Sequence, residues 1–175
     1  MPDTKDWTWV LERPCPECGF DASNVFPEQI GLRLRAATFK LIALLDDPLA
    51  RRRPAAEVWS ALEYGCHVRD VHRLYLLRLN LMLTEDEPHF ANWDQDATAI
   101  DSRYADADLD EVVGDLASDG ERLAEAFDAV TDWTRTGVRS DGAHFTIESF
   151  GRYLVHDPDH HVWDVEQGYA AMRDS

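Results

Sequence analysis

Hydrophobic residues recur at intervals of three and four along four separate stretches of this 175-residue chain, a pattern typical of amphipathic helices. The first stretch begins at Pro27 and ends before Asp46-Asp47-Pro48, because proline disfavours helical geometry in the residue before it. The second covers about residues 57–83 and the third about 108–130. The fourth begins after Thr146, a residue type that caps helices, and runs to about Ala170. The sequence therefore predicts four long helices.

The segments between these helices suggest how the helices are connected. Residues 85–107 contain prolines and aspartates without a sustained period, and so long a connection is either functional or a crossover between distant helix ends. Residues 133–145 alternate loosely around Ser140-Asp141-Gly142, which predicts a short hairpin. We therefore expect an all-α, up-up-down-down four-helix bundle over residues 27–175, with the second and fourth helices facing each other. We expect residues 1–26 to form an irregular N-terminal extension.

Composition narrows the classes of partner. A hydrophobic content of 45% is enough for one domain with a substantial core, and the net charge of −17 argues against binding to nucleic-acid phosphates. No apolar run approaches the roughly 18–20 residues that a membrane span needs, and no secretory signal is visible. We expect a cytoplasmic protein that binds a small-molecule substrate. Homodimerisation through the bundle faces is compatible with the pattern.

Three histidines provide the main candidate chemistry. His156 and His160 are four residues apart on the fourth helix, so one face of that helix presents both. His67 lies on the inward, mostly apolar stripe of the second helix and can supply a third metal ligand. Such a site leaves open positions for water or substrate. His161 replaces His160 if Pro158 distorts the turn, and a core histidine satisfied by a hydrogen bond is the simpler alternative at each position. The remaining histidines are expected to be structural or exposed: His72, His89 and His144.

The strings around these histidines resemble an actinobacterial-type branch of the DinB-like superfamily of metal-binding four-helix bundles. They are WSALEYGCHVRDV at 59–71, NWDQD at 92–96 and HDPDHH at 156–161, and the resemblance spans about residues 27–168. It implies a divalent metal ion, Zn²⁺ or Ni²⁺, on His67, His156 and His160. Several relatives use the metal to activate a low-molecular-weight thiol for transfer or isomerisation. The chain departs from the common pattern at Pro158 and in its cysteine-containing N-terminal extension.

Other residues near these histidines have candidate supporting roles. Asp70 lies one turn from His67 and Asp164 one turn from His160, so either carboxylate can orient a ligand ring, although an exposed surface charge explains both equally well. Glu63 is a candidate general base, with helix packing as the simpler explanation. Trp93, in the long connection, is a candidate apolar wall for substrate.

Cys15-Pro16-Glu17-Cys18-Gly19 has the shape of a zinc knuckle, in which a turn directs two thiolates at one metal ion. Three interpretations remain open. The pair is half of a second metal site completed by histidine or aspartate from the bundle, or a redox dithiol, or two reduced structural thiols. Thioredoxin-like chemistry requires a βαβ unit, which the pattern lacks.

Two functional hypotheses follow from these motifs. The first is a metal-dependent enzyme, a thiol transferase or hydrolase-like bundle in which the metal lowers the pKa of water or of a thiol. The second is a non-catalytic domain in which the metal holds the bundle together. Open metal positions next to a pocket would favour the enzyme, whereas a fully coordinated, dry site would favour the structural role.

Overall fold

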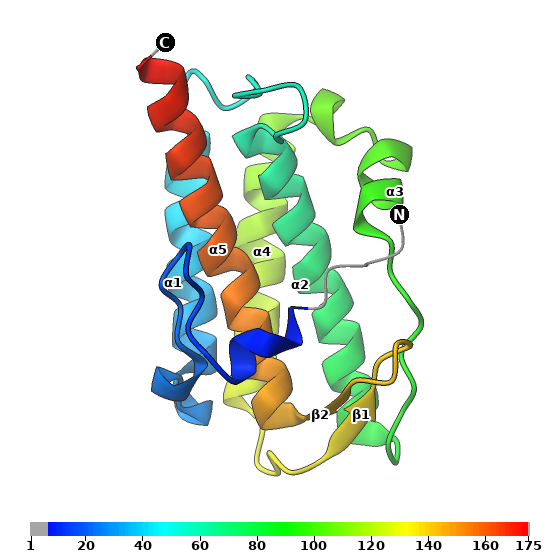
Figure 1. The fold of residues 1–175 in the computed structure, drawn as a ribbon. Helices are drawn as coiled ribbons and strands as arrows, with labels where there is room; N and C mark the ends of the chain where they lie inside the picture. The colour runs from blue at the N-terminus through cyan, green and yellow to red at the C-terminus, as the bar shows by residue number, and fades with distance from the viewer. Residues whose placement is uncertain (1–6, 175) are drawn as a thin grey trace.

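The computed structural model describes residues 7–174, and its four long helices form a bundle (Figure 1). These helices are α1 (Ile30–Leu45), α2 (Ala61–Thr84), α4 (Leu109–Asp128) and α5 (Ile147–Arg173). Their ranges lie close to the four periodic stretches of the sequence. The prediction of an all-α four-helix bundle is confirmed.

Side chains at the helix N-termini explain where the helices begin. Ser60 accepts a hydrogen bond from the backbone of Glu63, whose carboxylate accepts one from the backbone of Ser60 in return. This reciprocal capping box satisfies amide groups that have no partner within the helix. Helix α2 therefore begins after Ser60 rather than near Glu57. Asp108 caps α4, and Thr146 caps α5 as expected from the sequence.

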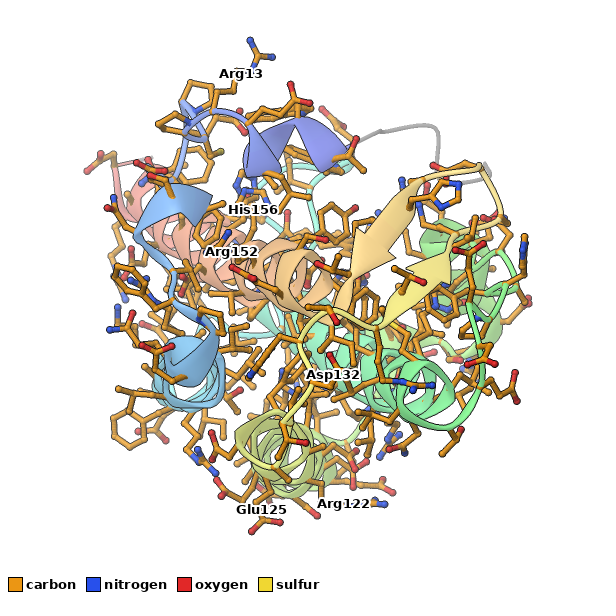
Figure 2. All side chains as sticks on the ribbon, turned by 90° about the horizontal axis from the view of Figure 1, so that it is seen from below. Arg13, Arg122, Glu125, Asp132, Arg152 and His156 are labelled. Atoms are coloured by element: carbon orange, nitrogen blue, oxygen red, sulfur yellow. The ribbon has the colours of Figure 1, made fainter. Side chains whose placement is uncertain are left out.

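Each long helix packs against two neighbours. Helices α1 and α2 each contact both α4 and α5, so that α1 and α2 occupy diagonal corners, as the view along the bundle shows (Figure 2). In the view of Figure 1, α1 and α5 run upwards and α2 and α4 run downwards. The neighbouring pairs α1/α5 and α2/α4 are therefore parallel, and the pairs α1/α4 and α2/α5 are antiparallel. The order along the chain is up, down, down, up, which differs from the expected up-up-down-down order because the crossover joins α2 to a parallel helix, α4. Helices α2 and α5 lie side by side, which is the relationship that the candidate site requires.

Two clusters of buried apolar side chains fill the bundle. The lower cluster includes Leu34, Leu79 and Phe150, and the upper one includes Leu62 and Leu116. Burial of such side chains is the main favourable contribution to folding. Several buried polar side chains are also present: Thr38, His67, His72, Asp119, His156 and His160.

The long connection between α2 and α4 is a crossover. It returns from the lower end of α2 to the upper start of α4, and it contains the short helix α3 (Gln95–Asp101) and the 3₁₀ helix η4 (Tyr104–Asp106) (Figure 1). The sequence pattern did not predict α3, which is too short to show a helical period. Asp94 caps it by accepting a hydrogen bond from the backbone of Ala97 at 2.9 Å.

The expected hairpin lies between α4 and α5. Strands β1 (Thr136–Val138) and β2 (His144–Thr146) are antiparallel, with Thr136 opposite Thr146. Gly142 in the turn has a φ of +89°, a conformation that glycine adopts without strain. His89 of the crossover forms a backbone bridge to Val138, so the hairpin and the crossover are connected.

The N-terminal segment folds over α5. Its described part contains the 3₁₀ helices η1 (Thr8–Leu11), η2 (Ala22–Asn24) and η3 (Pro27–Gln29). Residues 1–6 of the expected extension lie outside the described residues. Val10 and Phe20 are buried, and Nε of Arg152 in α5 donates a hydrogen bond to the carbonyl of Val25 at 2.8 Å. This segment therefore covers one side of α5 (Figure 2).

Helix α5 is continuous from end to end, although Pro158 lies inside it. Proline removes one backbone hydrogen bond and favours a bend, but here it does not divide the helix into two. Within residues 7–174, no helix combines the length and the apolar character needed to cross a membrane.

Candidate metal centre

A pocket of about 400 Å³ opens between α2, α5, the crossover and the N-terminal segment. Trp93 of the crossover, which we expected to form a substrate wall, lies in its lining. Trp7 and Glu17 contribute from the N-terminal segment. Helix α5 contributes polar side chains from both of its inward rows: His156, Asp157, His160, His161 and Asp164. The lining is therefore both aromatic and polar, with several groups that can bind cations.

Three possible metal ligands meet beside this pocket. His67, Asp157 and His161 each offer one ligand atom, and these atoms lie within 4.8 Å of one another. Nε2 of His67 is 3.4 Å from Oδ2 of Asp157, and Nε2 of His161 is 3.6 Å from the same oxygen. Since α2 supplies the first residue and α5 the other two, the contact between these helices brings the group together. We refer to these three residues as the pocket group.

Aromatic rings enclose the pocket group. The ring of Trp93 stacks on His67 with centroids 5.5 Å apart and an interplanar angle of 15°, and Trp59 lies at the same centroid distance from His67. Tyr64 contacts His161 with centroids 5.0 Å apart. These contacts fix the orientation of both imidazoles and reduce their access to water, which strengthens electrostatic interactions between them and Asp157.

The carboxylate and the imidazoles of the pocket group each favour the charged form of the other. Although burial alone lowers the pKa of His161, the nearby carboxylates Asp157 and Asp164 outweigh it and raise that pKa to about 9. Burial likewise opposes the ionisation of Asp157, but His161 and His67 hold the pKa of this carboxyl group well below its usual range. The pocket group therefore contains an ionised carboxylate between two imidazoles.

The pocket group fits a divalent metal ion. Oδ1 of Asp157 is buried and has no hydrogen-bond partner among residues 7–174, and the same is true of Nδ1 of His67. A buried carboxylate oxygen without a partner is costly, and a bound cation would satisfy it. Two histidines and one carboxylate are also the protein ligands of several catalytic metal sites, in which other coordination positions remain open.

The other two predicted histidine ligands belong to a different group. His156 and His160 offer ligand atoms within 4.8 Å of those of Cys15 and Cys18. Figure 2 shows His156 on the side of α5 that the N-terminal segment covers. We refer to these four residues as the cysteine–histidine group. The structure thus divides the predicted set, with His67 in one group and His156 and His160 in the other.

Helical geometry explains this division. Successive residues of an α-helix point about 100° apart, whereas residues four apart lie in one row. His156 and His160 form one row on α5, and Asp157 and His161 form the next. Only the second row contacts His67. The sequence contains this second pair with the same spacing, whereas the prediction includes His161 only as a replacement for His160.

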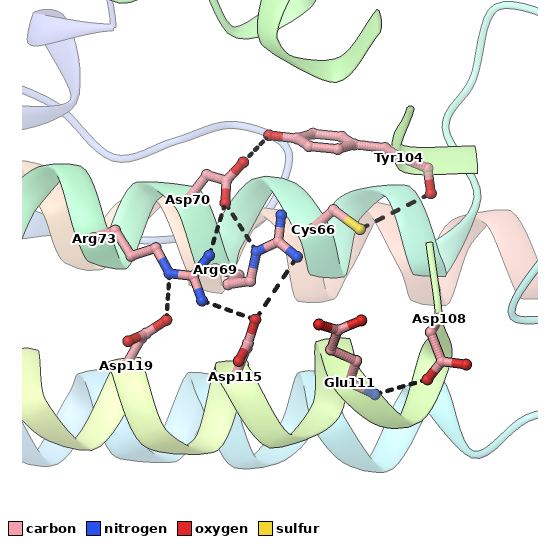
Figure 3. Close-up of polar contacts among 9 residues, drawn as sticks. All are labelled: Cys66, Arg69, Asp70, Arg73, Tyr104, Asp108, Glu111, Asp115 and Asp119. Carbon is pink, nitrogen blue, oxygen red and sulfur yellow. Dashed lines mark hydrogen bonds and ion pairs between the residues drawn. The ribbon is translucent and has the colours of Figure 1, made fainter. Parts of the chain in front are cut away.

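The structure places the two predicted supporting carboxylates differently. Asp164 lies beside the candidate ligands, with Oδ2 at 2.9 Å from Nδ1 of His161. Asp70 instead accepts a hydrogen bond from the hydroxyl group of Tyr104 at 2.6 Å and pairs with Arg69 and Arg73 (Figure 3). Asp70 therefore connects α2 to η4.

Glu63, the candidate general base, has a structural role. Its carboxylate is buried in the capping box at the start of α2 and is paired with Arg53. Although burial raises the pKa of Glu63, the hydrogen bonds from Arg53 and Ser60 outweigh it and lower that pKa. The hydrogen bonds and the ion pair of this carboxylate account for its burial without a catalytic role.

The remaining histidines differ in their surroundings. His89 and His144 are exposed, whereas His72 is only 1% exposed. Burial lowers the pKa of His72 to about 4, although Asp157 and Asp119 oppose this shift. His72 is therefore a neutral core residue near physiological pH.

Comparison with sequence models of protein families identifies the family. The sequence model of the DinB superfamily matches residues 32–165, which include the whole pocket group. This chain belongs to the DinB superfamily. The match begins after Cys15 and Cys18, so this DinB-superfamily chain carries its cysteine pair outside the matched region.

A solved structure shares the fold of this DinB-superfamily chain. YfiT from Bacillus subtilis superposes with a TM-score of 0.75 at 21% sequence identity, over 84% of this chain and 87% of YfiT. YfiT is described as a probable metal-dependent hydrolase with an unusual four-helix bundle topology. No curated protein is similar enough in sequence to be matched. The likeness to YfiT shows the fold of this chain.

Proposed function

We propose that this chain is a metal-dependent enzyme that uses the pocket group, His67, Asp157 and His161, to activate water or a small thiol. The observation that carries the proposal is the convergence of these three side chains beside a pocket of about 400 Å³. Three protein ligands leave coordination positions for other molecules, which is typical of catalytic rather than structural sites. The description of YfiT as a probable metal-dependent hydrolase is consistent with this class of chemistry.

In this proposal, the residues around the pocket group orient its imidazole rings and shield them from water. Asp164 holds the ring of His161 through Nδ1, which leaves Nε2 on the side of Asp157. Trp93 and Trp59 shield His67 from water. A bound divalent ion would act as a Lewis acid and lower the pKa of water or of a thiol. Zn²⁺ and Ni²⁺ are both compatible with histidine and carboxylate ligands.

The pocket suits a small polar substrate. Its lining includes Asn92 and Gln95 from the crossover and Arg139 from the hairpin, where Nη1 donates a hydrogen bond to the hydroxyl group of Tyr153 at 3.0 Å. We propose that the substrate enters between these polar groups and Trp93. A low-molecular-weight thiol is then the proposed second substrate for transfer or isomerisation, and water is the nucleophile for hydrolysis.

The test combines metal analysis with an activity screen. Metal-loaded protein is assayed for ester and amide hydrolysis, and for transfer and isomerisation with small thiols, beside His67→Ala and His161→Ala. Both variants should lose activity and bind one metal ion fewer, because each removes one of the three protein ligands. The exposed His144→Ala is the matched control and should behave like the wild type. Unchanged metal content and turnover in both ligand variants would overturn the proposal.

A further inference from the structure

The cysteine–histidine group has the local structure of a preformed ligand set. The backbone amide of Gly19 donates a hydrogen bond to the carbonyl of Cys15 at 3.0 Å, and the amide of Cys15 donates to the carbonyl of Phe20 at 2.8 Å. Gly19 has a φ of +74°, which lets the chain reverse directly after Cys18. The resulting tight turn brings both thiols toward α5.

Helix α5 supplies the other half of the group. His156 and His160 lie one turn apart, and Nδ1 of His160 is 3.7 Å from Sγ of Cys15. A tetrahedral zinc ion with bonds of about 2.0–2.3 Å separates its ligand atoms by roughly 3.3–3.8 Å. The ligand atoms of the group already lie within 4.8 Å of one another. Small side-chain movements are therefore enough to close a four-ligand site.

Burial and charge favour a closed site with a divalent cation. Cys15, His156 and His160 are 2%, 5% and 7% exposed, and Nε2 of His156 is buried without a partner among the described residues. The rings of Trp7 and Phe20 cover His156, with centroid distances of 5.5 Å and 5.2 Å. Two thiolates would balance the charge of Zn²⁺, so a neutral unit would occupy this apolar environment.

We propose that Cys15, Cys18, His156 and His160 bind a structural zinc ion, separate from the metal of the pocket group. Two sulfur and two nitrogen ligands select Zn²⁺ and leave no position for substrate. The zinc would attach the N-terminal segment to α5 across about 140 residues of sequence. Since Trp7 and Glu17 of that segment line the pocket, the zinc would also fix one wall of the pocket.

This proposal stands independently of the proposed function, because the two groups share no residue. The donor chemistry separates them, since only the cysteine–histidine group contains sulfur. The residues matched by the family model include the two histidines of this group but not the two cysteines, which precede the matched region.

The first experiment measures metal stoichiometry in the full-length protein purified under reducing conditions. Elemental analysis should give two metal ions per chain for the wild type and one for Cys15→Ser/Cys18→Ser. His67→Ala/His161→Ala should also retain one ion, and that ion should be zinc. Cys66→Ala is the matched control, because Cys66 is a buried cysteine outside both groups, and it should retain two. Equal stoichiometry in the wild type and the double cysteine variant would overturn the proposal.

The second experiment decides the question even if the double cysteine variant does not fold. Wild-type protein reconstituted with Co²⁺ should show the intense near-ultraviolet charge-transfer absorption of thiolate–Co²⁺ bonds, and His67→Ala/His161→Ala should retain it. In the zinc form, Cys15 and Cys18 should resist alkylation until a chelator is added, as detected by peptide mass. Absence of the charge-transfer band, or a Cys15–Cys18 disulfide in metal-free protein purified without chelator, would overturn the proposal. Loss of activity in the pocket variants with the band intact would separate this site from the proposed function.

Discussion

Asp164 holds His161 in place, with Oδ2 of the carboxylate 2.9 Å from Nδ1 of the imidazole. The other carboxylate oxygen of Asp164 lies 3.8 Å from Nε2 of His160. One side chain therefore contacts a histidine from each candidate metal group. Carboxylates in this position orient ligand rings and increase their basicity.

We predict that Asp164→Ala weakens metal binding by the pocket group about 10- to 100-fold, because the ring of His161 loses its orienting partner. Competition with a metal-binding dye measures the affinity. Glu166→Gln is the matched control, since Glu166 is exposed on the same helix, and it should bind metal like the wild type. An unchanged affinity in Asp164→Ala would contradict this role.

Removal of metal should lower the stability of the fold. An ion that binds only the native state stabilises it by about 4 kcal/mol when its free concentration is 1,000 times Kd. For a chain of this size, we expect a chelator to lower Tm by roughly 10 °C. Calorimetry before and after chelation measures the change, and readdition of zinc should reverse it. A Tm that does not move, in protein shown to have lost its metal, would argue against this linkage.

Acid should destabilise the protein through His72. This histidine has a pKa of about 4 in the folded state, below the value of about 6.5 in an unfolded chain. The unfolded state therefore binds the proton first, so the stability contributed by neutral His72 is complete above pH 6.5 and is lost as the pH falls toward 4. We expect the stability difference between the wild type and His72→Leu to change by about 2–3 kcal/mol between pH 7 and pH 4.5. Urea unfolding at both pH values measures it, with the exposed His144→Ala as a control that should show no such change.

Glu63→Gln should affect stability and leave catalysis intact. Glutamine can preserve the capping box of α2 but loses the ion pair with Arg53, so we expect a loss of about 1–2 kcal/mol. Denaturant unfolding measures the loss, while metal content and turnover should match the wild type. A large decrease in turnover at wild-type metal content would restore Glu63 as a candidate general base.

The fold was predictable because each long helix carries its own local signal. The apolar residues of α4, for example, recur along one stripe, and Val112, Leu116 and Leu123 of that stripe are all buried. Helix α3 was not predicted, because its seven residues are too few to show a helical period of apolar positions. Its main local signal is the N-cap residue Asp94. The course of the crossover depends instead on long-range packing, such as the contact of Tyr104 with Asp70.

The candidate site was predictable only in part. The helical positions of His67 and of the pair His156 and His160 follow from spacing. Which row of α5 faces His67, and which faces the cysteines, depends on the rotation of α5 about its axis. That rotation is set by contacts between distant segments, including Arg152 with Val25 and His160 with Cys15. No local pattern encodes such contacts. The sequence therefore indicated histidine, cysteine and carboxylate ligands, whereas their division into two groups required the structure.

The offset of one residue between the two rows of α5 constrains how this helix can evolve. Deleting a single residue between Thr146 and His156 would rotate both rows by about 100° relative to the helix start, and neither would then meet its partners. Single substitutions elsewhere on α5 leave both rows in place. A change of length in the first turns of α5 would instead remove the contacts of His156 and His160 with the N-terminal segment and those of Asp157 and His161 with His67. We expect relatives that possess both groups to differ in loop lengths while the spacing from the start of α5 to His161 stays fixed.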